Sequence, residues 1–382
     1  MMKSLAQFRP VYVVGIGLHP YQNRSETTYV TLGLRAVREA LADAGIRWPD
    51  VESAYIGNAL VGMAAGAGML RYLGTTGIPF AQVENASASG STAFRQSVLE
   101  VAAGFTDVSL AMGVDTVDTW RSGPGKAKVR GLADQLAAPF THFAMLTEKY
   151  MAEAGATPEQ IAKVAVKNHR NGAYNPYAQR QKVRTLEEVM APPVISGVLT
   201  RLQCTPVGEG AAAVIVMSED GIARHGIDRG RAIRVVASAS RSEEASGREN
   251  FDVALTRKTT YEAYEQSGVE PKELDVLEVH DAFTIEELLY VEAMGLCQPG
   301  EAAAALERGD YDIGGKHAVS ASGGLIAMGH PLGPTGTGQV VEVVRQLRGE
   351  AGVRQQPNAR VGLTHMVGIG PVCLVHILRK DN

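Results

Sequence analysis

The stretch AVREALADAGIRWPDVESAYIGNA, residues 36–59, has a near copy later in the chain, TYEAYEQSGVEPKELDVLEVHDAF, residues 260–283. Each copy has a helical apolar pattern that ends at a glycine and continues through a polar turn into an alternating strand. Gly45 matches Gly268 and Asn58 matches Asp281 at a constant spacing. We interpret the pair as a duplication; the alternative is chance similarity between two helix–turn–strand units.

A second pair of segments repeats in the same order. NASASGSTAFRQSVLE, residues 85–100, and GHPLGPTGTGQVVEVVRQ, residues 329–346, are both turns of small residues that lead into helices. If the two halves superpose, Ser87 and His330 lie at equivalent helix N-termini. We therefore expect these two residues to meet in one central cleft.

The domain organisation follows from the same repeat. The first half ends near residues 208–227, and the second half opens with a strand at Ala232. Residues 116–200 are richer in arginine, lysine and amide side chains, which indicates an insertion over one face. We predict an α/β protein with units 1–230, including a loop domain at about 116–200, and 231–382.

Bulk composition excludes several functions. The 382 residues are 45% hydrophobic, carry a net charge of −4 and contain 6% aromatics, so neither a basic field nor a base-stacking platform points to nucleic acid. No run of about 18 apolar residues and no signal peptide is seen, so we expect a cytoplasmic protein. The three cysteines lack disulfide or zinc spacing, and no HExxH, Walker or GxGxxG motif occurs.

Ser87 stands where an apolar strand turns into a helix, a place where enzymes often mount a nucleophile. Serine also caps helices well, and a serine hydroxyl needs a positioned base before it attacks a carbonyl. From the residues alone, capping or turn formation is the more ordinary interpretation. A nucleophile, or a nucleophile that has been replaced, is the alternative.

Three histidines lie at the ends of predicted elements. His280 follows a strand in EVHDAF and can donate to a substrate carbonyl, or it can be a structural histidine. His330 lies among glycines, where a ligand can approach closely, and is a candidate general base. His365 precedes a turn in which the N–H of Gly370 can face an oxyanion.

These stretches resemble the thiolase superfamily, and within it the sterol carrier protein X-type thiolases and the bacterial lipid-transfer-protein-like acetyl-CoA acetyltransferases. The resemblance covers essentially the whole chain and rests on VENASASGSTAF (83–94), HDAF (280–283), GGLIAMGHPLGPTG (323–336) and HMVGIGP (365–371). It implies a five-layer αβαβα fold built from two duplicated βαβαβαββ halves, with an inserted loop domain that grips coenzyme A.

The resemblance also assigns roles. The family's nucleophilic cysteine falls on Ser87, and its activating histidine falls on His330. His280 takes the place of the residue that polarises the thioester oxygen, and the N–H groups of residue 87 and Gly370 would form an oxyanion hole.

Two departures from the family pattern limit this mechanism. Ser87 would form an oxygen ester, which reacts less readily with thiols than a thioester does. In many thiolases a second cysteine acts as acid and base, but its two possible positions hold Ala282 and Gly368 here.

Three hypotheses follow. The first is thiolase-type acyl transfer, either thiolysis of a 3-oxoacyl-CoA or the reverse Claisen condensation, by an impaired or trapped form. The second is retro-aldol cleavage of a branched 3-hydroxyacyl-CoA, as in steroid side-chain aldolases, with His280, His330 and a tyrosine such as Tyr290 as acid and base. The third is a catalytically silent acyl-CoA-binding subunit.

The resemblance implies coenzyme A or acyl-CoA as the substrate and no covalent cofactor or metal. Coenzyme A phosphates favour cations, so Arg121, Lys126 and Lys167 are candidates, although a solvated surface charge is the more ordinary interpretation of any one of them. His169, in KNHRNGAYNP (167–176), is expected to shape the pantetheine tunnel. We also expect a homodimer and an OB-fold/zinc-ribbon accessory subunit.

Overall fold

The computed structural model describes residues 4–117, 139–244, 251–369 and 372–381. Its large mixed sheet has ten strands in the order β10-β9-β11-β12-β8-β1-β7-β4-β2-β3. The strands are β1 Val11–Gln22, β2 Ser53–Gly57, β3 Phe80–Val83, β4 Val108–Asp115, β7 Glu209–Ser218, β8 Ile233–Ser242, β9 Val276–Glu278, β10 Ala318–Val319, β11 Val361–Gly368 and β12 Val372–Arg379.

This sheet consists of two halves with the same strand order. The first half runs β3-β2-β4-β7-β1, and the second runs β10-β9-β11-β12-β8. In each half the second strand is parallel to its neighbours, and the last three strands are antiparallel. Within the sheet of the described residues, the two halves pair where Tyr12 and Val13 of β1 lie opposite Arg234 and Ile233 of β8. The common order agrees with the duplication that the sequence predicts.

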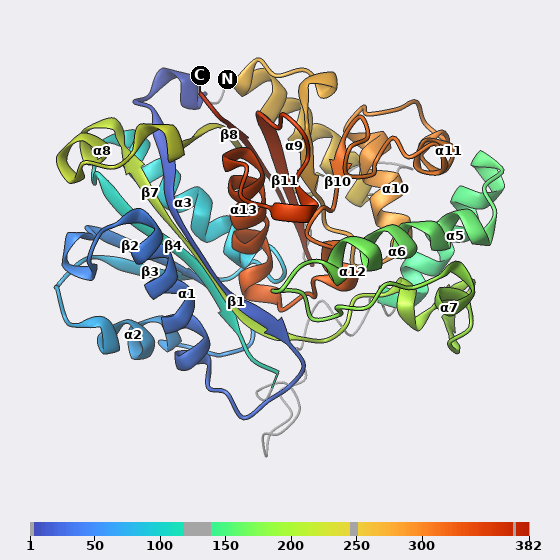
Figure 1. The fold of residues 1–382 in the computed structure, drawn as a ribbon, viewed down its shortest axis with the longest axis horizontal. Coiled ribbons are helices and arrows are strands. Elements are labelled where there is room, and N and C mark those ends of the chain that lie inside the picture. Colours follow the sequence, from blue (N-terminus) through green and yellow to red (C-terminus); the bar gives the residue numbers. More distant parts are fainter. Residues whose placement is uncertain (1–3, 118–138, 245–250, 370–371, 382) are drawn as a thin grey trace.

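Helices lie on both sides of each half-sheet (Figure 1). Outer helices α1 and α9 pack on β1 and β8, whereas α3 and α13 pack against each other between the halves. The helices are α1 Tyr29–Ala44, α2 Ala65–Leu70, α3 Ser89–Ala103, α5 Pro139–Ala154, α6 Pro158–Ala173, α7 Leu186–Met190, α8 Glu219–His225, α9 Phe251–Ser267, α10 Thr284–Ala293, α11 Ala302–Glu307, α12 Gly324–Ala327 and α13 Leu332–Arg348.

The two copies of the repeat end their helices in the same way. Gly45 after α1 and Gly268 after α9 both have φ of +68°, the left-handed conformation that glycine adopts without a Cβ penalty. A short 3-10 helix follows each glycine, at Trp48–Asp50 and Pro271–Glu273. The spacing read from the sequence therefore marks equivalent structural units.

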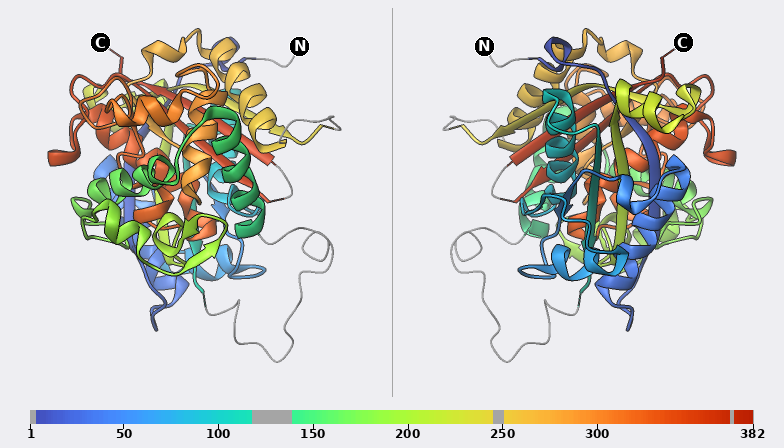
Figure 2. Two further views of the ribbon diagram at one scale, coloured as in Figure 1. Left: turned by 90° about the vertical axis from the view of Figure 1, so that its right-hand side faces the viewer. Right: turned by 90° about the vertical axis from the view of Figure 1, so that its left-hand side faces the viewer.

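The inserted segment interrupts only the first half. Three residues, 369–371, separate β11 from β12 in the sequence, whereas their counterparts β4 and β7 are separated by residues 116–208. Within the described part of that segment lie α5, α6, α7 and a small hairpin of β5 Val194–Ser196 and β6 Leu199–Thr200. Helix α6 packs on α10, α11 and α12 of the second half, and the left view of Figure 2 shows the green helices next to the orange segments of that half.

A buried histidine links the central helices to the second half-sheet. His376 on β12 is fully buried and lies 2.8 Å through Nε2 from Ser91 Oγ on α3 and 3.0 Å through Nδ1 from Ser238 Oγ on β8. Burial, with a smaller effect of Arg95, lowers its pKa to about 3, so the ring is neutral at ordinary pH.

Among the described residues, no helix combines the length and apolarity needed to cross a bilayer.

Candidate active site

Ser87 lies in the turn between β3 and α3, but it does not cap the helix. The N-cap position belongs to Ala88, and Ser89 Oγ instead accepts the N–H of Asn85 at 2.9 Å. Ala86 has φ of +49°, a left-handed conformation that is strained for a residue with a Cβ. The Ser87 hydroxyl is thereby turned toward His330, with Oγ 3.1 Å from Nε2.

The neighbours of His330 define its tautomer. Thr335 donates its hydroxyl hydrogen to the carbonyl of Pro331 at 2.6 Å, so its oxygen accepts from His330 Nδ1–H at 2.9 Å. Nε2 therefore carries the lone pair, and Ser87 donates its hydrogen to it. Burial, with a smaller effect of His280, holds the pKa of His330 well below 6.5, so the imidazole stays neutral. This is the arrangement that a general base requires.

Glycines let the two central helices approach closely enough to form this pair. A Cβ on Gly336 of α13 would lie 2.5 Å from the Ser91 nitrogen of α3, and a Cβ on Gly90 of α3 would lie 2.4 Å from the Gly333 carbonyl oxygen. A real Cβ does not fit at either distance. The N-termini of α3 and α13, with Ser87 and His330 beside them, meet because these positions lack side chains.

A buried carboxylate links the loop that carries His330 to the first half. Asp115, at the end of β4, accepts the N–H of Gly333 at 2.6 Å and the N–H of Leu60 at 2.7 Å. Burial raises its pKa to about 6, although the N–H donors act in the opposite direction. Asp115 therefore connects the first half to the start of α13 in the second half.

His280, after β9, faces the same site. Its ring lies edge-on to the His330 ring, with 5.2 Å between centroids. Nδ1 is 3.1 Å from Oε1 of Glu286 in the first turn of α10, and the His280 N–H approaches His365 Nδ1 at 3.4 Å. Nε2 is buried and has no hydrogen-bond partner among the described residues. The ring thus presents one free nitrogen beside the pair formed by Ser87 and His330.

Tyr290 is close by, but it is engaged by the protein. Its hydroxyl donates to Glu286 Oε1 at 3.0 Å, and its ring packs edge-on against His365. The side chain is fully buried, and burial beside Glu286 holds its pKa well above 10. The hypothesis that Tyr290 acts on the substrate is not supported by this geometry, and its hydroxyl instead stabilises the Glu286 carboxylate.

The two positions that would hold a second cysteine offer no acid or base. Ala282 is buried and accepts the Thr205 N–H through its carbonyl oxygen. A Cβ on Gly368, at the end of β11, would lie 2.3 Å from the carbonyl oxygen of Asn85 in the Ser87 turn. Close packing of β11 against this turn therefore requires glycine at 368.

The cysteines of the chain do not supply the missing thiolate. Cys204 donates its thiol to the Thr200 carbonyl at 3.4 Å, and burial raises its pKa to about 12. Burial likewise raises the pKa of Cys373 to about 12 and that of Cys297 to about 11. A thiolate is thus disfavoured at all three positions. In the described ranges, no cluster of three or more histidine, cysteine or acidic residues is placed to hold a metal ion.

The predicted coenzyme A contacts meet different outcomes. Arg121, Lys126 and Gly370 lie outside the described residues. Lys167 is 3% exposed, and its ammonium lies 3.0 Å from Glu287 and donates to the Val319 carbonyl at 2.6 Å. A buried ion pair thus occupies the Lys167 side chain, and phosphate binding by this residue stays a prediction that its geometry does not favour.

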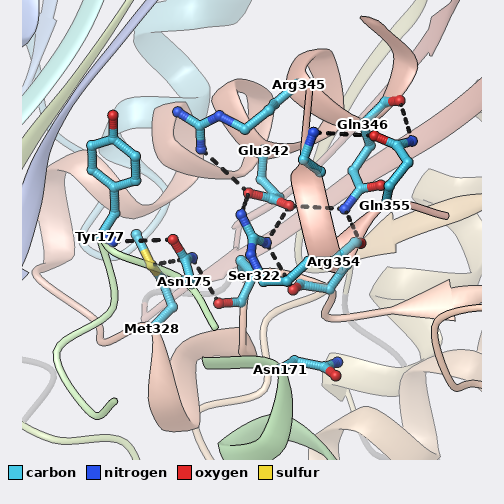
Figure 3. A network of polar contacts seen from close by, with 12 residues as sticks. Asn171, Asn175, Tyr177, Ser322, Met328, Glu342, Arg345, Gln346, Arg354 and Gln355 are labelled. Atoms are coloured by element: carbon cyan, nitrogen blue, oxygen red, sulfur yellow. Dashed lines mark hydrogen bonds and ion pairs between the residues drawn. The ribbon is translucent and has the colours of Figure 1, made fainter. Parts of the chain in front are cut away.

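The KNHRNGAYNP segment clamps the inserted domain onto the second half. Asn168 donates to Asp281 at 2.6 Å, Asn171 donates to the Ser320 carbonyl at 3.1 Å, and Asn175 donates to the Ser322 carbonyl at 2.8 Å. Ser320 and Ser322 belong to the loop that leads through α12 to His330, and Figure 3 shows Asn171 and Asn175 beside it. These amides position the loop.

His169 is buried in the same segment. Its Nε2–H donates to the Leu202 carbonyl at 3.3 Å, and burial lowers its pKa to about 4. A role for His169 in a pantetheine tunnel stays a prediction.

Two residues that complete the site were missed at the sequence level. Thr335 lies five positions after His330, and Glu286 lies six positions after His280. Both look like ordinary residues in the first turn of a helix. The signal that could have found them is a histidine just before a helix, followed five or six residues later by a hydrogen-bonding side chain in the first turn of that helix. At this spacing the first helical turn brings the side chain back toward the histidine.

Known protein families and individual relatives match this chain over most of its length. A family model for the thiolase N-terminal domain matches residues 11–220, and a model for a thiolase C-terminal domain-like region matches residues 237–379. The benzoylsuccinyl-CoA thiolase subunit BbsB of Thauera aromatica is 37% identical over 372 residues, 95% of either chain. Sterol carrier protein 2 of Gallus gallus is 37% identical over 389 residues, 96% of this chain and 71% of that protein.

A solved structure agrees over the same span. The Ltp2–ChsH2(DUF35) aldolase superposes with a TM-score of 0.84 at 25% identity, over 98% of each chain. The α/β fold expected from the sequence is thus confirmed as a thiolase fold. From the two family models and the full-length relatives, this chain belongs to the thiolase family of acyltransferases, which act on coenzyme A thioesters.

Proposed function

We propose that this chain transfers acyl groups between coenzyme A thioesters, by thiolysis of a 3-oxoacyl-CoA or the reverse Claisen condensation, with residue 87 as the acyl acceptor. The observation that carries the proposal is the 3.1 Å contact between Ser87 Oγ and the lone-pair nitrogen of His330. A hydroxyl paired with a neutral, oriented imidazole is the arrangement used for nucleophilic catalysis. Ser87 also lies beside the N-terminus of α3, whose partial positive charge favours a developing oxyanion.

The serine at position 87 determines how fast acyl transfer is expected to be. Attack by a hydroxyl instead of a thiolate, followed by thiolysis of an oxygen ester, costs upward of about 4 kcal/mol in the barrier, which is about a thousandfold in rate. The chain with Ser87 is therefore proposed to be an impaired or acyl-trapping form of the site.

The test compares three proteins: the unaltered chain, Ser87→Cys and Ser87→Ala. Each is incubated with a 3-oxoacyl-CoA and coenzyme A, and products and the mass of the peptide carrying residue 87 are measured. We expect Ser87→Cys to accelerate thiolysis, the unaltered chain to show slow turnover or an acyl adduct on Ser87, and Ser87→Ala to show neither. Thiolysis by Ser87→Ala at the unaltered rate, or no gain with cysteine, would contradict the proposal.

Aldol cleavage is a second candidate, favoured by the structural match to the Ltp2–ChsH2(DUF35) aldolase. His330 would take the 3-hydroxyl proton of a branched 3-hydroxyacyl-CoA, the C2–C3 bond would break to leave a ketone, and the enolate would be protonated at C2. No acyl-enzyme forms in this reaction. Ser87→Ala therefore separates the two candidates, because it abolishes acyl transfer but spares aldol cleavage. Binding of acyl-CoA without either product in any variant would indicate the silent subunit.

The exposed edge of the first half-sheet supports a homodimer. Strand β3 is the last strand of the sheet, and Phe80 on it is 48% exposed. An open strand edge with an exposed aromatic side chain favours pairing with a second copy. We expect Phe80→Asp to shift the sedimentation coefficient from dimer to monomer, and an unchanged dimer would refute this edge as the contact.

An accessory subunit is the remaining proposed partner. The structural neighbour, the Ltp2–ChsH2(DUF35) aldolase, contains a DUF35 component by name. We propose that an OB-fold/zinc-ribbon subunit of this kind associates with the chain. Assays of both candidate reactions with and without such a subunit test the proposal, and equal rates without complex formation would reject it.

A further inference from the structure

Acyl transfer and aldol cleavage share a proton transfer that the pair formed by Ser87 and His330 does not provide. When the C2–C3 bond breaks, the acetyl-CoA carbanion must receive a proton at C2, and His330 already holds the proton taken from the attacking or departing oxygen. Ala282 has no ionisable group, and Gly368 lies against the Asn85 carbonyl where a Cβ would be 2.3 Å away. Another group must therefore supply this proton.

His280 has the geometry for that step. One nitrogen, Nδ1, is 3.1 Å from the Glu286 carboxylate, while the other, Nε2, is buried and unpartnered among the described residues. Its ring is in edge-on contact with that of His330, with 5.2 Å between centroids, so both imidazoles border the same site. Glu286 is itself fixed, because it accepts the Phe283 N–H at 2.8 Å and the Tyr290 hydroxyl at 3.0 Å.

We propose that Glu286 is a positioning residue that holds His280 by Nδ1, so that Nε2 of His280 is the second proton-transfer group, in place of the family's second cysteine. The inference rests on the proposed function. In the forward direction His280, protonated on both nitrogens, gives its Nε2 proton to C2 and releases acetyl-CoA. The incoming coenzyme A thiol then returns a proton to Nε2, and its sulfur displaces the Ser87 oxygen, which takes the proton back from His330.

The surroundings of His280 favour this assignment over the other two imidazoles. Glu286 and Tyr290 face it from α10, His365 from β11 and His330 from the loop before α13. Among the described residues, the ring nitrogens of His365 are bonded to neutral groups, Nε2 to the Thr256 hydroxyl at 2.9 Å and Nδ1 to the backbone N–H of His280 at 3.4 Å.

Charge distinguishes the three rings further. The pKa values of His330 and His365 are both held low, first by burial and then by the charge of His280. Asp252 on α9 adds a negative charge near Glu286. Of the three rings, only that of His280 lies within hydrogen-bond distance of a carboxylate of the described residues, with Nδ1 3.1 Å from Glu286 Oε1.

The experiment isolates this step from acyl transfer. In D2O, an enzyme that ionises C2 of acetyl-CoA exchanges its methyl hydrogens for deuterium, which mass spectrometry of acetyl-CoA detects. The assay is done in the Ser87→Ala background, where no acyl-enzyme forms. Glu286→Gln is added, which keeps an oxygen for Nδ1–H but removes the charge. The matched control is Glu292→Gln on the same helix, where the carboxylate contacts Tyr150 and the Ala302 N–H.

The expected result is deuterium exchange by Ser87→Ala and by its Glu292→Gln derivative. With Glu286→Gln we expect a loss of about tenfold or more in the maximal rate at an unchanged half-saturating acetyl-CoA concentration. A purely structural role would weaken acetyl-CoA binding instead. Exchange that is absent from Ser87→Ala, or undiminished by Glu286→Gln, would overturn the inference, whatever the thiolysis assay shows.

Discussion

Replacement of Gly336 by alanine tests how the two halves bring the site together. Alanine is the better helix former by about 1 kcal/mol, so propensity alone predicts that Gly336→Ala stabilises α13. The structure predicts the opposite sign. The new Cβ would lie 2.5 Å from the Ser91 nitrogen and 2.7 Å from the Ser91 Cβ, where ordinary contact begins at 3.4 Å.

The magnitude follows from that gap. To reach 3.4 Å the helices must separate by 0.9 Å at the crossing. Overpacking of this kind costs about 1–3 kcal/mol in the free energy of unfolding. If the shift reaches the helix N-termini, the 3.1 Å contact between Ser87 and His330 opens to about 4 Å, beyond hydrogen-bond range. A misplacement of about 1 Å lowers catalysis by about a hundredfold.

Two measurements check this prediction. Urea denaturation gives the free energy of unfolding, and acylation of residue 87 by a 3-oxoacyl-CoA, made in the Ser87→Cys background for signal, gives the catalytic effect. Gly230→Ala, at an exposed 3-10 turn away from the crossing, is the control and should change neither. If Gly336→Ala is as stable as its parent or more so, and is acylated at the same rate, the close crossing does not hold the pair together.

Two further predictions concern histidines. Thr335→Val removes the acceptor for His330 Nδ1–H and should lower kcat about a hundredfold at constant KM. The control, Thr337→Val, loses only a bond to the Gly90 carbonyl and should retain most activity. Equal losses of kcat in the two variants would refute the tautomer assigned to His330. Because the pKa of His376 falls from 6.5 to about 3 on folding, the unfolded state binds a proton first as pH falls below 6.5, and stability at pH 5 should drop by about 2 kcal/mol. His376→Gln lacks this term, so the stability gap between the two proteins, measured by urea denaturation, should narrow by that amount from pH 8 to pH 5, and a constant gap would contradict the assignment.

The parts of the molecule that were predictable are those with a periodic or repeated signal. The matched glycines at 45 and 268 located equivalent helix ends, and the small-residue turns at 85–100 and 329–346 predicted that Ser87 and His330 would meet. Such features depend on local backbone chemistry and on order along the chain. For that reason these features could be predicted from one sequence.

The remainder depended on which side chains are buried together, which spacing does not reveal. Lys167 was expected at a phosphate because it is a cation in the inserted segment, but burial pairs it with Glu287, 120 positions away. From the residues alone, capping of α3 was the more ordinary interpretation of Ser87, yet Ser89 makes the local hydrogen bonds and Ser87 does not. Long-range pairing of polar groups therefore set the limit of sequence reasoning here.

The contact of Gly368 with the Asn85 carbonyl has an evolutionary consequence. Thiol chemistry could return at residue 87 by one substitution, because the serine already occupies that place. A second thiol could return at position 282, where a methyl group is already accommodated, but not at 368, where any added carbon would displace the turn that carries residue 87. A second cysteine can therefore be introduced in the HDAF segment, at position 282, but not in strand β11, at position 368.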